Sequence, residues 1–138
     1  MTSSGFEPTL IQKLFALRAV RPFDRLEANE AVLIARVARP RAYAPGAAIH
    51  PGGVPLTRLL VVAEGTIRDG LGGAVGPIVG VRSLLHDTVS APLTADPAAG
   101  ANLLEISRRH FYTLARECPA FVIGLIELGE QGHRGAGG

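Results

Sequence analysis

His86 and Asp87 are adjacent in the sequence, and a histidine beside a carboxylate can relay a proton or supply two ligands of a metal site. No third ligand lies nearby, so the pair is interpreted as the end of a short helix. Cys118 has no neighbour that would activate it as a nucleophile, and it is interpreted as a packing residue. Neither a Ser–His–Asp arrangement nor a pair of carboxylates can be argued from the spacing. We therefore assign no catalytic residue, no metal ligand and no cofactor, and expect a protein that is not an enzyme.

Two other groups of residues suggest phosphate binding. The glycines of Asp69–Gly73 lack the GxxxxGK[ST] pattern of a phosphate loop, so they are interpreted as a strand connection. Arg36, Arg39 and Arg41 form a modest basic cluster that permits a nucleic-acid contact, but a solvated edge is the favoured interpretation. Aromatic residues make up only 5% of the chain, which leaves few surfaces on which bases could stack. We expect no nucleic-acid partner.

The composition is that of one folded domain. The 138 residues are 47% apolar and 19% charged, with a formal net charge of +2, which excludes a disordered chain. A single cysteine excludes a disulfide framework, so a cytoplasmic location is expected. No apolar run reaches the ~18 residues of a transmembrane helix, and no basic leader precedes the first apolar stretch. Neither a membrane partner nor a signal peptide is expected.

The elements that would position these residues begin with two helices. Apolar residues at helical spacing predict an amphipathic helix within Glu7–Val20, which Pro22 ends. Asp24, followed three residues later by Glu27, predicts the N-terminal cap of a second helix. That helix should stop before Pro40, because the residue preceding a proline is pushed out of the helical conformation.

Short strands separated by turns follow. Strands are predicted at Ala47–His50, at Thr57–Ala63 with its continuous apolar run, at Thr66–Arg68 and at Asn102–Ile106. Asp69–Gly73 predicts a tight hairpin. Turn signals at intervals of roughly ten residues favour a β-sandwich or barrel. His50, which follows a strand and precedes a proline, is predicted to lie on the surface.

Two helices are predicted to close the chain. Ser107 is the expected N-terminal cap of the first, and Pro119 is suited to the first turn of the second. The second carries an apolar stripe, expected to bind a partner protein or a second copy of the chain rather than fold back on the sandwich. The stripe consists of Phe121, Val122, Leu125 and Ile126.

This order of elements resembles the cyclic nucleotide-binding domain family. The residues that carry the resemblance are Arg21–Phe23, Arg41–Gly46, Leu59–Ile67 and Glu105–Phe111. The resemblance implies an α+β fold in which a β-sandwich or jelly-roll barrel is flanked by N-terminal and C-terminal helices. The expected organisation is an N-terminal lead at 1–9, a cyclic nucleotide-binding-like domain at 10–128 and a flexible glycine-rich tail at 129–138.

Members of the family bind the cyclic phosphate with a short helix that follows a glycine–glutamate pair, and with an arginine about nine residues later. If Gly80 takes the place of that glycine, Val81 stands where the glutamate belongs, and the arginine position falls on Val89 or Ser90. Charge-assisted bonds contribute about 1.5–3 kcal/mol each. The loss of two would cost about 3–6 kcal/mol, or roughly a hundred- to ten-thousand-fold in affinity.

The sequence therefore predicts a regulatory or protein-interaction module built on a degenerate cyclic nucleotide-binding domain that does not bind cyclic AMP in the usual way. The alternative is an atypical sensor that binds a cyclic nucleotide or another anion within residues 80–91. The residues that would bind it are Gly80, Val81, Arg82, Ser83, Ser90 and Ala91.

Overall fold

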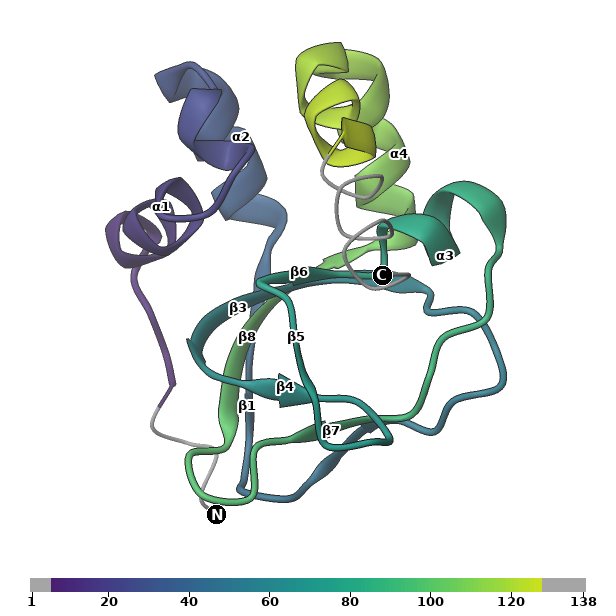
Figure 1. Cartoon of the computed structure of the whole chain (residues 1–138). Coiled ribbons are helices and arrows are strands. Elements are labelled where there is room, and N and C mark those ends of the chain that lie inside the picture. Colours follow the sequence, from purple (N-terminus) through teal and green to yellow (C-terminus); the bar gives the residue numbers. More distant parts are fainter. Residues whose placement is uncertain (1–5, 128–138) are drawn as a thin grey trace.

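The structure is a computed structural model that describes residues 6–127. Two four-stranded antiparallel sheets form its centre, and most of the helices gather on one side of them (Figure 1). The first sheet contains, in spatial order, β1 (Arg39–Tyr43), β8 (Ala101–Ser107), β3 (Arg58–Gly65) and β6 (Ile78–Val79). The second sheet contains β2 (Ala48–His50), β7 (Leu93–Ala95), β4 (Ile67–Arg68) and β5 (Ala74–Val75).

The helices lie before, within and after the strands. The labelled ones are α1 (Leu10–Arg18), the 3-10 helix η2 (Phe23–Arg25), α2 (Ala28–Val37), α3 (Val81–His86) and α4 (Arg108–Glu117). Residues 119–127 are also helical, after a break at Cys118. None of the helices between residues 6 and 127 is long and apolar enough to cross a bilayer.

Helix starts follow local capping chemistry, with one correction to the sequence prediction. The Ser107 hydroxyl accepts a bond from the backbone N–H of His110 and caps α4, as predicted. Asp24 does not cap α2, because the chain from Phe23 first makes a turn of 3-10 helix. The cap is Glu27, whose own N–H donates to the Glu30 carboxylate in a reciprocal capping box.

The predicted strands are present, and the apolar run of β3 is buried on both faces. Leu59 and Val61 pack under the helices, whereas Leu60 lies between the two sheets. Alternate residues of a strand point to opposite faces, so a strand covered on both sides reads as a continuous apolar run. The strands predicted from the sequence pattern did not include β1, β6 or β7, and β5 was implied only by the predicted hairpin at Asp69–Gly73. It also placed His50 on the surface, but its side chain is buried and its Nε2 lies 2.9 Å from the Val54 carbonyl oxygen.

Two cores result, one between the sheets and one between the first sheet and the helices. The helical core contains three aromatic rings in contact: Phe23 and Phe121 are tilted with centroids 5.3 Å apart, and Phe111 and Phe121 meet edge to face with centroids 6.2 Å apart. Phe121 therefore joins the N-terminal helices to α4. Aromatic pairs at these distances add to the free energy gained by burying their surface.

This packing corrects part of the predicted partner surface. Phe121 and Leu125 are fully buried in the helical core and offer no surface to another molecule. Val122 is half-buried against the same core, and only Ile126, 40% exposed, remains open to a partner. The reason is tertiary: the rings of Phe23 and Phe111 form a pocket that the sequence pattern alone does not reveal. The stripe mainly folds back on its own domain.

The observed architecture confirms the predicted fold class, a sandwich flanked by helices at both ends. The boundaries proposed at 10–128 stay a prediction. The expected glycine-rich tail, residues 129–138, lies outside the described residues.

Candidate functional site

The segment 80–91 begins with a glycine that no other residue could replace without strain. Gly80 is the N-terminal cap of α3 and has a φ of +114°. A Cβ at this position would lie 2.8 Å from the carbonyl oxygen of Arg58 on β3. Glycine thus allows the start of α3 to approach the first sheet closely. The helix ends at Asp87, which has a left-handed φ of +54°, and the predicted helix end at His86 and Asp87 is confirmed.

The side chains at the start of α3 are committed to packing and to local bonds. Val81 is 7% exposed and belongs to the helical core. Ser83 is 6% exposed, and its hydroxyl donates to the carbonyl oxygen of Thr88 at 2.7 Å, which closes the turn after the helix. Arg82 lies on the exposed side of α3. The start of α3 therefore presents backbone and one guanidinium, with no carboxylate.

The second half of the segment is tied to the loop before β3. The N–H of Ser90 donates to the Val54 carbonyl oxygen, and the N–H of Gly53 donates to the Ser90 carbonyl oxygen, both at 3.0 Å. Ser90 and Ala91 are held by these backbone bonds, and the Val89 side chain is 62% exposed. The six predicted site residues thus lie on one segment, but their described polar bonds are to neighbouring protein groups.

A partly buried polar cluster, centred on the buried Glu105, lies on the first sheet and was not predicted from the sequence. The Tyr43 hydroxyl donates to Glu105 Oε2 at 2.8 Å, and Arg58 Nε donates to Glu105 Oε1 at 3.0 Å. Arg58 also donates to the Ile49 carbonyl oxygen of the second sheet at 3.3 Å. Glu105 is only 8% exposed, so these bonds replace the water that a buried carboxylate would otherwise need.

The electrostatics of the cluster agree with this geometry. Burial, followed by the hydrogen bond to Glu105, raises the pKa of Tyr43 above its ordinary value. Burial lowers the pKa of Arg58. The charge of the Glu105 carboxylate and the hydrogen bonds of Arg58 with Tyr43 and Glu105 outweigh burial, so the pKa of Arg58 is raised overall. The one sequence signal was Glu105 itself, a carboxylate inside the apolar run Leu103–Ile106, which requires a partner.

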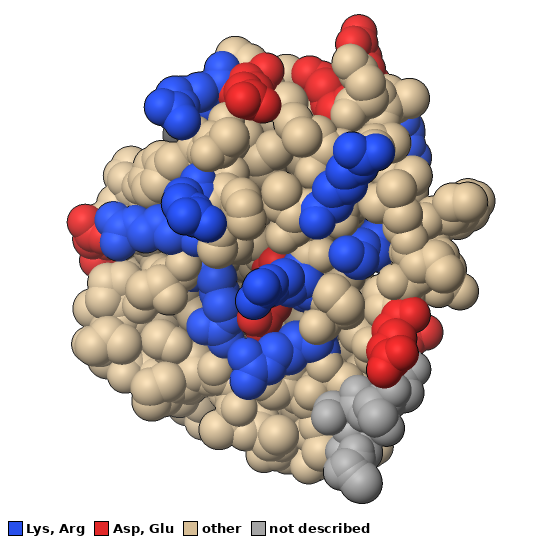
Figure 2. All heavy atoms as spheres, turned by 180° about the vertical axis from the view of Figure 1, so that it is seen from behind, with Lys and Arg blue, Asp and Glu red and all other residues tan. Residues whose placement is uncertain are grey.

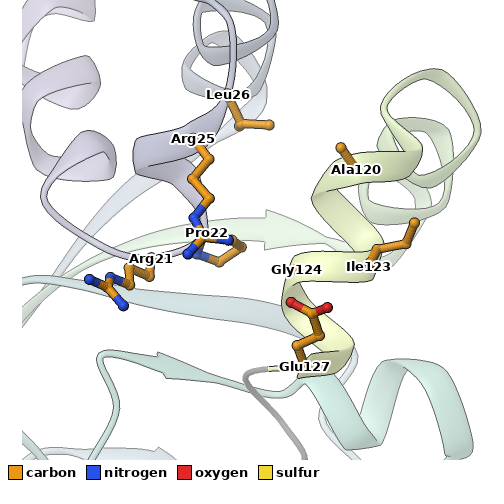
Figure 3. A pocket seen from close by; sticks show the side chains of 8 residues that line it. All are labelled: Arg21, Pro22, Arg25, Leu26, Ala120, Ile123, Gly124 and Glu127. Atoms are coloured by element: carbon orange, nitrogen blue, oxygen red, sulfur yellow. The ribbon is translucent and has the colours of Figure 1, made fainter.

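A groove of about 340 Å³ lies between η2 and the helical segment 119–127 (Figure 3). It remains open beside a tight contact: a Cβ at Gly124 would lie 2.5 Å from the Pro22 Cβ. Ile123, 57% exposed, forms part of its apolar wall. The lining residues are Arg21, Pro22, Arg25, Leu26, Ala120, Ile123, Gly124 and Glu127.

No group of three or more histidine, cysteine or acidic side chains within residues 6–127 is placed to hold a metal ion. Cys118 is buried, and burial raises its pKa, which disfavours the nucleophilic thiolate.

Solved structures share this architecture. No protein-family model and no curated protein matches the chain. The catabolite activator protein of Thermus thermophilus matches with a TM-score of 0.69 and 28% identity, over 83% of this chain and 58% of that protein. This chain has the cyclic nucleotide-binding domain fold. The resemblance inferred from the sequence is thereby confirmed.

Two further solved structures, both regulatory parts of protein kinase A, match at lower identity. The regulatory domain of Toxoplasma gondii PKA with cAMP has a TM-score of 0.64 and 20% identity, over 78% of this chain and 46% of that one. The regulatory subunit of a cAMP-independent protein kinase A from Trypanosoma cruzi, bound to guanosine, has the same score and identity, over 86% and 46%. This chain spans between about half and three fifths of these proteins.

Proposed function

We propose that this cyclic nucleotide-binding domain is a regulatory, protein-interaction module without enzymatic activity, and that it does not bind cyclic AMP as its charged relatives do. The neighbours support a regulatory role, since they are an activator protein and regulatory parts of kinases. A cytoplasmic location accords with that role.

One observation supports the proposal: a short helix opens on a left-handed glycine, as the resemblance leads us to expect, but the two positions at which it implies charged residues are uncharged. Gly80 opens α3 with a left-handed φ, but Val81 is an apolar core residue and Val89 is exposed and uncharged. A phosphate at such a helix start would meet backbone N–H groups and the exposed Arg82, but neither of the two charged residues expected from the resemblance. Without two charge-assisted bonds, a micromolar site would fall to millimolar affinity, a loss of about 3–6 kcal/mol.

The test is titration calorimetry of the whole chain with cyclic AMP, cyclic GMP and cyclic dinucleotides. We expect no binding tighter than about 1 mM. A dissociation constant below about 10 µM would overturn the proposal. Val89→Arg and Ser90→Arg are the matched variants, because one of them restores the missing guanidinium on the exposed side of the segment. If lost charge is the reason for weak binding, one variant gains about tenfold or more in affinity.

The same titration decides the alternative, an atypical sensor that uses residues 80–91. The guanosine-bound, cAMP-independent relative from Trypanosoma cruzi favours including guanosine among the ligands. Tight binding that Arg82→Gln weakens, and that Arg116→Gln on α4 does not, would establish the sensor and replace the interaction module.

The groove beside η2 is the surface that we propose for the protein partner or the second copy of the chain. Ile123 and Ile126 are 57% and 40% exposed on the helical segment 119–127. Deleting this segment would remove Phe121 and uncover the rings of Phe23 and Phe111, so the informative variant is Ile123→Asp, which keeps the core. It should abolish capture of the partner or concentration-dependent dimerisation. Leu71→Asp, which introduces the same charge at an apolar side chain that is 97% exposed in the hairpin after β4, serves as the control.

A further inference from the structure

Three residues of the edge strand β1 share one face of the first sheet. Arg39, Arg41 and Tyr43 alternate with Pro40 and Ala42, and alternate residues of a strand point the same way. Arg39 pairs directly opposite Glu105 on β8. Residues opposite each other in an antiparallel pair lie on the same face. The arginines of β1 therefore stand beside the Tyr43–Glu105–Arg58 cluster.

Contacts join these residues into one surface, which we name the arginine face: Arg39, Arg41, Tyr43, Arg58 and Glu105. The Arg41 guanidinium lies over the Tyr43 ring, 5.4 Å from its centroid. The Tyr43 hydroxyl accepts a bond from Arg58 at 3.4 Å. Figure 2 shows the molecule from behind the view of Figure 1, and on this side basic side chains gather around a partly covered acidic group.

The positive charge of the arginine face is not balanced within the described residues. Both oxygens of Glu105 are occupied, one by Tyr43 and one by Arg58. Arg39 and Arg41 are exposed, and none of the ion pairs found within residues 6–127 includes them. Two guanidinium groups therefore project into solvent beside a carboxylate that is already neutralised.

We propose that the arginine face binds an extended acidic segment of a partner protein. Side chains two residues apart on a strand are about 6.6–6.8 Å apart, so Arg39 and Arg41 match the spacing of alternate carboxylates in another extended chain. Guanidinium groups form paired hydrogen bonds with carboxylates. Pro40 lies between the arginines and has no N–H to donate, so recognition falls on the side chains rather than on the strand edge.

One feature favours an acidic peptide over nucleic acid. The chain as a whole carries a formal net charge of only +2, whereas nucleic-acid affinity rests on neutralising many phosphates. The face is distinct from the groove beside η2 and from residues 80–91, so its test succeeds or fails independently of the proposed function.

The experiment measures binding of a synthetic peptide of alternating glutamate and threonine to the whole chain, at low and at moderate salt. We expect salt-sensitive binding that Arg39→Gln with Arg41→Gln weakens about tenfold. The control pair, Arg109→Gln with Arg116→Gln, removes the same charge from α4, which packs against the opposite face of the sheet. This control pair should leave the affinity for the acidic peptide unchanged. As a second control, the wild-type chain should not bind a peptide of alternating glutamine and threonine.

Three results would overturn the proposal. One is no binding of the acidic peptide, and another is an equal loss of affinity in both double variants. The third is tighter binding of random duplex DNA, weakened by the same two β1 substitutions, which would assign the face to nucleic acid instead. Circular dichroism of each variant confirms that the exposed substitutions leave the fold intact.

Discussion

An anion site needs suitable backbone geometry and positive charge. In this molecule the segment 80–91 has the first and the arginine face has the second. The segment has the backbone geometry, a left-handed glycine at a helix start, but its neighbouring side chains are the apolar Val81 and Val89. The arginine face has the charge, but it lies on an open strand edge. Arg58 belongs to the arginine face and adjoins the segment, because its guanidinium binds Glu105 and its backbone carbonyl oxygen lies close to Gly80. The backbone geometry of an anion site and the positive charge that such a site uses can thus lie in different places of one fold.

The largest effect is expected at the segment. Gly80→Ala places a Cβ 2.8 Å from the Arg58 carbonyl oxygen at a positive φ, so we expect a loss of about 2–4 kcal/mol in the free energy of unfolding. Gly46→Ala is the matched control, because its φ is also positive but no atom lies within 4 Å. It should lose about 1 kcal/mol. Equal losses in urea unfolding would show that the contact with Arg58 contributes nothing.

The next effect is expected on the arginine face. Glu105→Ala leaves Arg58 and Tyr43 without their shared acceptor. The pair is only partly buried, so the loss in the free energy of unfolding should be about 1–3 kcal/mol, between the values for buried and exposed pairs. Glu64→Ala removes an exposed carboxylate bonded to Asn102 and should change stability by less than about 0.5 kcal/mol. If Glu105→Ala also lowered the free energy of unfolding by less than about 0.5 kcal/mol, the Tyr43–Glu105–Arg58 cluster would not contribute to stability.

The contribution of Tyr43, on the arginine face, to the free energy of unfolding is expected to depend on pH. Because the pKa of Tyr43 is raised in the folded state, its contribution to stability is present below the unfolded pKa of about 10. The contribution is lost as the pH rises through the folded pKa. The stability difference between wild type and Tyr43→Phe should therefore be constant up to about pH 10 and shrink above it. Chemical unfolding at a series of alkaline pH values measures this, and a constant difference throughout would contradict it.

The smallest effect is expected from the two exposed arginines. Arg39→Gln with Arg41→Gln should change the free energy of unfolding by less than about 0.5 kcal/mol, since neither forms an ion pair within residues 6–127. A loss above about 1 kcal/mol would mean that these arginines serve folding rather than binding.

Sequence reasoning succeeded where the signal is local. Ser107 as a cap, the hairpin at Asp69–Gly73 and the apolar run of β3 each depend on a few adjacent residues. It failed where distant residues decide. Burial of Phe121 depends on rings from both ends of the domain, and the two-residue strand β6 exists only because β3 lies beside it.

The same limit applies to the candidate sites. The cap at Gly80 and the short helix after it were accessible from the resemblance to known domains. The partnership of Arg58 with Glu105 was not, because the two residues are 47 positions apart and meet only through the register of β3 and β8. Asp24 was preferred to Glu27 as a helix cap because the prediction did not foresee a 3-10 turn after Pro22.

The tight fit of Pro22 against Gly124 has a consequence for how the domain assembles. The helical layer contains residues that precede the strands in the sequence and residues that follow them, so the contact between Pro22 and Gly124 closes a loop that contains every strand. Contacts at such separation form at a high entropic cost until the intervening chain is ordered. A bulkier residue at position 124 would keep η2 and the helical segment 119–127 apart, so the sheets could form while the helical core stays incompletely packed.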